Sequence, residues 1–249
     1  MREDGNDSRY HFLDSIRGLT LISMILYHLV WDLMYLFGKN HIFPVEAVYY
    51  WQQSICRTFI LLSGFCWSLG KRKVRRGILV LLGGTLIFTV TSIIYPQQPI
   101  LFGILHMLGL SMLLLIPLDK MIKRIPTSIG FFGCLGLFIL LKDIQYGFIG
   151  IEDWKWISVP KEWYRDSFTA CLGFPGPDFY SVDYFPILPW FFLFVAGYYL
   201  YRYIENKEAI LEKLKWGIPG LNFLGENSLL IYLIHQPIIY GILQLWFAR

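Results

Sequence analysis

The sequence has few cysteines and few charged residues, and both shortages narrow the class of protein. Its four cysteines form no C-x-x-C pair, so a zinc or iron–sulfur site and a disulfide-built scaffold have no support. Only 16% of the 249 residues are charged, whereas 55% are hydrophobic. A soluble domain has about a quarter of its residues charged. We therefore predict a membrane protein with the lipid bilayer as a partner, no metal and no nucleic acid.

The hydrophobic residues fall into seven runs. A membrane-spanning helix needs about 20 apolar residues, and runs without period-two alternation favour helices over barrel strands. The fold predicted is all-α, a polytopic integral membrane helix bundle of about seven transmembrane helices that forms a single domain, residues 1–249. The predicted spans are 12–37, 47–70, 78–95, 100–118, 126–142, 185–204 and 222–247.

Positively charged residues set the predicted orientation. They concentrate at the N-terminus, in the loops 71–76 and 119–124, and in the 202–215 stretch. Because Lys and Arg favour the cytoplasmic side, the N-terminus is predicted to be cytoplasmic. The aromatic-rich segment 143–184 then becomes one large outer loop. The expected location is the plasma membrane, with multiple passes.

The first predicted span carries four polar residues, which a membrane-spanning helix holds for a buried partner or a function. At about 100° per residue they share an arc of about 60°, which we expect to face the bundle interior. They are Asp14, Arg17, His28 and Asp32. On a helix, His28 lies about 16 Å further toward the outer side than Arg17.

Two more histidines, His106 and His235, lie in later spans, and the predicted orientation places them with His28 in the outer half of the membrane. Imidazole exchanges a proton near neutral pH. Asp32, one helical turn after His28, suits fixing the tautomer of that ring. The pair suits removal of a proton from a hydroxyl or amine, or transient acylation of the ring. A hydrogen bond without chemistry is the alternative. We take His28, Asp32, His106 and His235 as candidate catalytic residues.

Two arginines in or near the spans are candidate donor-binding residues. Guanidinium groups match phosphate oxygens, so Arg17 and Arg57 suit a phosphorylated cytoplasmic ligand. The alternative for Arg17 is a salt bridge with Asp14, and Asp32 is an alternative partner for Arg57. His11, in the N-terminal tail, is expected to be solvated.

The outer loop and the last span supply the candidate substrate-binding residues. Flat aromatic rings with nearby carboxylates suit stacking on sugar rings, whereas an aromatic belt at the membrane interface is the alternative. From these segments we select Asp183, Tyr232 and Gln236.

Four stretches resemble one known family. F-L-D-S-I-R-G-L-T-L-I-S-M-I-L-Y-H-L-V-W-D-L at 12–33 is similar to the opening helix of the heparan-α-glucosaminide N-acetyltransferase catalytic-domain family, in particular its short bacterial members. F-G-I-L-H-M-L-G at 102–109, the 181–198 stretch and L-G-E-N-S-L-L-I-Y-L-I-H-Q-P at 224–237 are similar to later blocks.

The resemblance implies an integral membrane acyltransferase, in the wider superfamily that includes acyltransferase-three enzymes. Acetyl-CoA is then the cytoplasmic acyl donor, and the acceptor is a carbohydrate or cell-envelope glycan on the far side. In the acyltransferase-three branch an Arg followed after ten residues by a His marks the first helix, as Arg17 and His28 do. The lysosomal family member has Asn where His28 stands and its reactive His in the next outer loop, where His41 lies nearby.

Two other function classes are alternatives. The intramembrane histidines could form the proton relay of a transporter or exporter, although the sequence has no internal repeat to support one. Paired histidines could also be the axial ligands of a haem-binding electron carrier. A homo-oligomer is possible on the sequence alone.

Overall fold

The computed structural model describes residues 9–39, 42–151 and 154–247, and most of these residues are helical. The chain divides into two compact units. We call residues 1–59 with 204–249 the terminal unit, and residues 60–203 the central unit. The expectation of a single functional domain stays a prediction.

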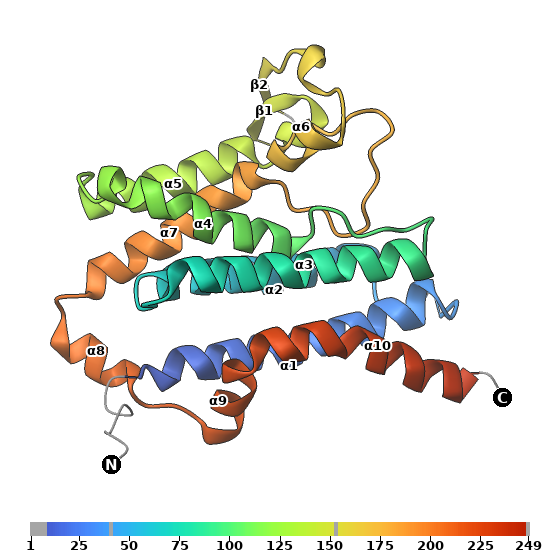
Figure 1. The fold of residues 1–249 in the computed structure, drawn as a ribbon, viewed down its shortest axis with the longest axis horizontal. Coiled ribbons are helices and arrows are strands. Elements are labelled where there is room, and N and C mark those ends of the chain that lie inside the picture. The colour runs from blue at the N-terminus through green and yellow to red at the C-terminus, as the bar shows by residue number, and fades with distance from the viewer. Residues whose placement is uncertain (1–8, 40–41, 152–153, 248–249) are drawn as a thin grey trace. The chain divides into compact units, whose positions relative to one another are not determined.

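The terminal unit is organised along its first helix. Its elements are α1 (His11–Tyr35), the beginning of α2 (Val45–Trp67), α8 (Glu208–Leu214), α9 (Pro219–Glu226) and α10 (Ser228–Phe247). Both α9 and α10 pack against α1 (Figure 1). A Cβ atom on Gly18 would collide with the carbonyl of Leu221, and one on Gly225 with the carbonyl of Asp14. These two glycines therefore allow the backbones of α1 and α9 to touch.

The central unit holds the remaining long helices. They are the end of α2, α3 (Lys73–Ile94), α4 (Ile104–Ile122), α5 (Thr127–Leu141) and α7 (Ile187–Ile204). Helices α3 and α4 run side by side (Figure 1). Gly197 of α7 meets the carbonyl of Leu61, so the ends of α2 and α7 also approach to backbone contact. Tyr198 and Phe194 beside it are fully buried.

The segment between α5 and α7, predicted only as a loop, has structure of its own. Its elements are η1 (Ile144–Tyr146), β1 (Phe148–Ile151), β2 (Trp154–Ser158), η2 (Lys161–Trp163) and α6 (Ser167–Leu172). β1 and β2 pair antiparallel, with Phe148 opposite Ser158. A small core of Ile144, Val159 and Phe174 lies beneath them. These core residues are about fifteen positions apart, a spacing too long to give the short-period pattern by which a sequence reveals an element.

Six helices in the described part of the chain are long and apolar enough to cross a membrane. They are α1, α3, α4, α5 with its extension to Tyr146, α7 and α10. The predicted span 47–70 corresponds to α2, which has 23 residues but is less apolar than these six. Glu46 and two adjacent glutamines in its first half, with Arg57 just past its middle, lower its hydropathy.

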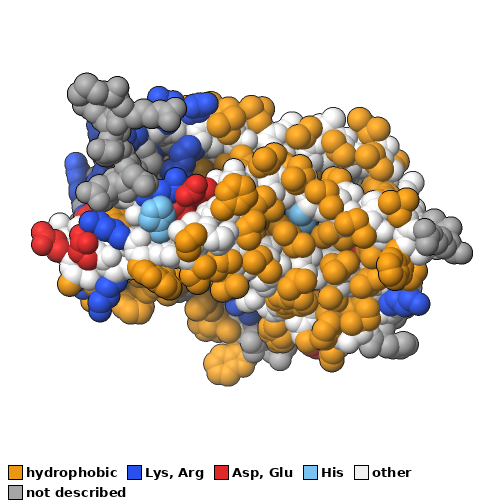
Figure 2. All heavy atoms as spheres, turned by 90° about the horizontal axis from the view of Figure 1, so that it is seen from below, with side chains coloured by type: hydrophobic (Ala, Val, Ile, Leu, Met, Phe, Trp, Pro, Cys, Tyr) orange, Lys and Arg blue, Asp and Glu red, His pale blue; other side chains and the backbone are white. Residues whose placement is uncertain are grey.

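Exposed hydrophobic side chains form stripes along the candidate spans. On α10 they recur at every fourth position, at Leu230, Ile234, Ile238 and Ile242. Figure 2 shows hydrophobic side chains over most of the face that it presents, with charged side chains toward the ends. A soluble protein does not expose so continuous an apolar surface, whereas a bilayer covers it with acyl chains. Together with the six candidate spans, this surface indicates a multi-pass membrane protein.

Candidate active site in the terminal unit

The polar stripe of α1 faces the interior of the terminal unit. Asp14 and Asp32 are 5% and 0% exposed, and Arg17 and His28 are part-buried. Asp14 accepts hydrogen bonds from Arg9 Nε at 2.8 Å and from Arg17 Nη1 at 3.4 Å. The salt bridge between Arg17 and Asp14, the alternative that the sequence offered, is therefore present. This contact uses one of the five N–H donors of the guanidinium, and the described residues give Arg17 no second hydrogen bond.

Arg9 joins the beginning of α1 to the end of α9. Besides Asp14, it contacts Glu226, with Nη2 3.3 Å from Oε1. The hydrogen bond to Asp14 raises the pKa of Arg9. His11, Asp14 and Glu226 each bring one potential ligand atom to within 4.8 Å of the others. A metal ion at that point would have to displace Arg9 from both carboxylates, so the charges of this cluster are already matched.

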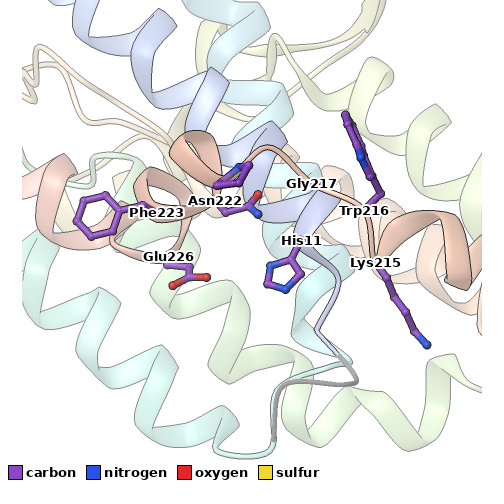
Figure 3. A pocket seen from close by; sticks show the side chains of 8 residues that line it. His11, Lys215, Trp216, Gly217, Asn222, Phe223 and Glu226 are labelled. Atoms are coloured by element: carbon purple, nitrogen blue, oxygen red, sulfur yellow. The ribbon is translucent and has the colours of Figure 1, made fainter.

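A pocket of about 530 Å³ opens beside this cluster, between α1 and the segment that joins α8 to α9. Figure 3 shows the His11 ring next to Glu226, with Lys215 and Trp216 on the other side. The rings of Trp216 and Phe223 are largely exposed. The prediction that His11 is a solvated tail residue is therefore wrong. It is the first residue of α1, and its Nδ1 atom is buried without a hydrogen-bond partner among the described residues.

Further along α1, His28 meets His235 of α10. The centroids of the two imidazole rings are 4.8 Å apart, with the planes inclined at 55°. Tyr27 contacts the edge of the His28 ring, and Tyr232 lies 5.4 Å from the His235 ring, centroid to centroid. Two of the three candidate catalytic histidines are thus in direct contact, although 207 positions separate them in the sequence.

Asp32 forms hydrogen bonds with Gln236, which the sequence analysis selected as a substrate-binding residue. Gln236 Nε2 donates to both carboxylate oxygens of Asp32, at 2.8 and 3.0 Å. Among the described residues no hydrogen bond joins Asp32 to the His28 ring, the contact expected from their spacing. The reason is tertiary: α10 brings the Gln236 amide to the carboxylate, and Asp32 is completely buried there. Asp32 therefore fixes Gln236, and through it the position of α10.

Arg57 lies on an exposed part of α2. Its Nη2 atom donates to Gln53 Oε1 one turn earlier, at 3.4 Å. The structure does not bring it to Asp32, the partner that the sequence offered. A guanidinium on the surface of a helix can reach a headgroup or a soluble phosphate with equal ease.

His106 and Asp183 belong to the central unit, where His106 lies in the first turn of α4 and Asp183 contacts the first residue of that helix. Asp183 Oδ2 accepts a hydrogen bond from the Ile104 backbone N–H at 3.3 Å, which caps α4. Burial raises the pKa of Asp183 to about 6, and this hydrogen bond opposes the rise. His106, two residues after Ile104, is 8% exposed and packs on α3, where a Cβ on Gly84 would lie 3.0 Å from its Nδ1.

The aromatic outer segment exposes several large rings. Trp154 and Trp156 on β2, Trp163 and Phe168 are each more than half exposed. Both uses offered by the sequence, a sugar platform and a membrane-interface belt, need such exposure. His41, near which the resemblance places a reactive histidine, lies outside the described residues.

Sequence reasoning missed the residues that gather at the N-terminal end of the stripe. Arg9, Glu226 and Trp216 lie outside the predicted spans or at their ends, and charged or aromatic residues are common there. Arg9 reaches Asp14 from the residues before α1, and the packing of α9 on α1 brings Glu226 to the same cluster. The motif G-E-N-S at 225–228 shows Glu226 before an apolar run, but it does not indicate which residue Glu226 contacts.

These features define a multi-pass helical membrane protein with a polar site buried between α1 and α10. The family described as heparan-alpha-glucosaminide N-acetyltransferase, catalytic, matches residues 9–237, which include every candidate site residue. The chain belongs to this family, and the resemblance seen in the sequence is confirmed. It is an N-acetyltransferase family that uses acetyl-CoA as the donor. No curated protein and no solved structure matches the chain.

Proposed function

We propose that the protein is a cell-membrane acetyltransferase that moves an acetyl group from cytoplasmic acetyl-CoA to a sugar-like or glycan acceptor on the extracytoplasmic side. The observation that carries the proposal is the contact between His28 and His235. His28 lies on α1, the helix that also carries Arg17. Together with the family match over residues 9–237, this contact supports an acyl-transfer site within the terminal unit.

Acetyl-CoA, the acyl donor, binds at the N-terminal end of α1. Arg17, whose only hydrogen-bond partner among the described residues is Asp14, is the first candidate for the phosphates, and Arg57 is a second. The pocket beside His11 is large enough for a nucleotide base, and Trp216 gives that base a ring on which to stack. His28 lies eleven residues beyond Arg17, about 16 Å along the helix, a distance that the pantetheine arm has to span.

Acyl transfer takes place at the histidine pair. His28 or His235 removes the proton from the attacking hydroxyl or amine, or carries the acetyl group briefly. The acceptor attacks the thioester carbonyl, and the carbon–sulfur bond breaks. The leaving thiolate takes up the proton that the histidine removed, so that CoA is released as the thiol. Asp32 holds Gln236 in place for the acceptor.

The acceptor is bound by polar residues near the pair. Tyr232 and Gln236 are the candidates in the terminal unit. His106 and Asp183, from the central unit, remain candidates on the sequence argument. An amine or hydroxyl on a sugar ring suits this set, because each residue can hydrogen-bond such a group.

The topology that fits this reaction has the N-terminus in the cytoplasm. It adds α2 to the six candidate spans, which gives seven and places the C-terminus outside. The positively charged loops support this orientation.

Purified protein in lipid nanodiscs, supplied with [14C]acetyl-CoA and D-glucosamine, tests the proposal. We expect acetylated sugar and free CoA to form together. Of the two variants His28→Gln and His235→Gln, the one that removes the proton-transferring ring should lower turnover about 100-fold or more. Arg17→Gln should raise the KM for acetyl-CoA and leave kcat within a few-fold. Gln244→Ala, an exposed change on α10, is the matched control.

Two results would contradict the proposal. If neither sugar acetylation nor acetyl-CoA hydrolysis exceeds that of empty nanodiscs, and the protein binds no CoA, the enzyme assignment is wrong. Flux of glucosamine across proteoliposomes without acetyl-CoA would instead favour the transporter alternative.

A further inference from the structure

The tautomer of His235 is set by the helix that carries it. Its Nδ1 atom lies 2.6 Å from the backbone carbonyl oxygen of Tyr232, three residues earlier in α10. A carbonyl oxygen only accepts hydrogen bonds, so Nδ1 must carry the hydrogen and donate it. In a neutral imidazole one nitrogen is a donor and the other an acceptor. The lone pair of His235 is therefore on Nε2.

That Nε2 atom is buried and has no hydrogen-bond partner among the residues that the structure describes. The whole residue is 8% exposed. A buried polar atom without a partner costs about 1–3 kcal/mol, and native proteins keep few of them. A nitrogen lone pair left free in this way is the arrangement that a general base needs before its substrate arrives.

The next residue repeats the pattern. Gln236 donates through Nε2 to Asp32, while its Oε1 atom is buried without a partner in the described part of the chain. His235 meets His28 and Gln236 meets Asp32, two residues one turn apart on α1. The contact between α1 and α10 thus holds two unused acceptors and no matching donor. An amine or hydroxyl of a substrate supplies the missing hydrogen.

The surroundings distinguish His235 from His28. Among the described residues, the titratable groups in contact with the His235 ring are His28 from α1 and Tyr232 from α10. Asp32 is occupied by Gln236, so it does not orient the His28 ring. Among the described residues no hydrogen bond fixes the tautomer of His28. Of the two rings, only His235 has both a fixed donor side and a free acceptor side.

We propose that His235, through Nε2, is the general base of the transfer reaction. This inference rests on the proposed acetyltransferase function. As the acceptor nitrogen or oxygen attacks the thioester carbonyl carbon, Nε2 takes its proton and a new carbon–nitrogen or carbon–oxygen bond forms. The carbon–sulfur bond then breaks, and the His235 imidazolium returns the proton to the thiolate. The Tyr232 carbonyl holds the ring throughout.

Chemical rescue tests this role. We expect His235→Ala to lower thiol release from acetyl-CoA, with D-glucosamine as the probe acceptor, about 100-fold or more. Small azoles added to the variant should restore turnover, and the restored rate should rise with azole basicity. A purely structural histidine would show no such dependence. His28→Ala, measured in parallel, is the comparison. Rescue confined to His28→Ala would overturn the assignment and leave the acetyltransferase proposal standing.

His235→Asn guards against a variant that does not fold. The Asn amide can still donate to the Tyr232 carbonyl from the position of Nδ1, but it has no atom at the position of Nε2. We expect normal folding, an unchanged Kd for acetyl-CoA and the same loss of turnover. Turnover within a few-fold of wild type would refute the base assignment.

A readout independent of turnover is the 15N spectrum of protein labelled in histidine. One neutral histidine should be protonated at Nδ1, and its signal should be absent from His235→Asn. Protonation at Nε2 instead would overturn the inference. If the Nδ1 signal is present but wild-type protein neither transfers acetyl nor binds CoA, the proposed function fails and the tautomer argument survives.

Discussion

The two units bury polar groups in different ways. In the central unit, most buried polar side chains are hydrogen-bonded within the unit: Tyr198 donates to Asp119 at 2.7 Å, Tyr199 to the Ile122 carbonyl at 2.8 Å and Trp67 to the Met112 carbonyl at 2.9 Å. The buried atoms without a partner that the structure describes there are serine hydroxyls. In the terminal unit, the described atoms without a partner are ring nitrogens and an amide oxygen: His11 Nδ1 on α1, and His235 Nε2 and Gln236 Oε1 on adjacent residues of α10.

This difference separates packing from function. A satisfied polar contact within a span fixes one helix against another, because hydrocarbon offers no competing partner. An unsatisfied one has the same burial cost without that benefit, so a ligand is the natural explanation. On this argument we expect the ligand at the contact between α1 and α10, where the two unpartnered atoms lie on adjacent residues.

The largest effect is expected from Gln236→Leu. The change removes the donor that satisfies both oxygens of the fully buried Asp32, and a buried group that loses its partner costs about 3 kcal/mol. The unfolding temperature of the variant in detergent should be several degrees lower than that of the wild type, and its rate of acetyl transfer should also be lower. Gln244→Leu, an exposed change on α10, is the control. Equal unfolding temperatures for the two variants would show that the Asp32 contact contributes nothing.

In the central unit, Gly197→Ala tests the close approach of α7 to α2. The added Cβ meets the Leu61 carbonyl, so the helices must move apart, at a cost of about 1–3 kcal/mol. We expect a lower unfolding temperature without a matching change in the KM for acetyl-CoA. Gly136→Ala, where no atom lies within 4 Å of the new Cβ, should not lower it. A stable Gly197→Ala variant would contradict the packing described here.

A smaller effect is expected from Tyr198→Phe. It removes one donor from Asp119, but Lys123 Nζ still contacts the other carboxylate oxygen at 2.6 Å. The loss is therefore about 1 kcal/mol, or about 2–4 °C in unfolding temperature. Tyr180→Phe, on an exposed side chain, is the control. A loss as large as that of Gln236→Leu would erase the distinction between the units.

The smallest effect is a pH dependence at Asp183. Burial raises its pKa to about 6 in the folded protein, so between about pH 4 and 6 the folded state binds its proton more tightly than the unfolded state does. This contribution to stability is present at low pH and is lost as the pH rises through 6. Asp183→Asn should flatten that part of the unfolding profile and be slightly more stable than wild type at pH 7. Parallel profiles for the two proteins would contradict the burial of this carboxylate.

Several elements of the fold could be predicted from the sequence because a bilayer imposes simple requirements. The runs that became α1, α3, α4, α5, α7 and α10 were recognised from length and hydropathy alone. The run 47–70 was predicted as a span because its second half is apolar. The polar residues of its first half make α2 less apolar than the six candidate spans. The hairpin of β1 and β2 was missed because its core residues are far apart in sequence and its strands are short.

The candidate site divides in the same way. Helical periodicity placed Asp14, Arg17, His28 and Asp32 on one face of α1, since 3.6 residues per turn is a local property. The partner of Asp32 could not be predicted, because the nearest candidate by spacing was His28 and the actual donor, Gln236, comes from a helix about two hundred residues away. Glu226 was missed for the same reason, since α9 brings it to the beginning of α1 from about two hundred residues away.

The sequence by itself determined that this chain lies in a membrane, which of its helices are apolar enough to cross it, which family it belongs to and which face of α1 is polar. These properties depend on composition and on short-range periodicity. Only the tertiary structure decided that His28 meets His235, that Asp32 is satisfied by Gln236 and that His235 Nε2 is left free. Those contacts depend on how α10 packs along α1, and no local pattern of residues encodes that register.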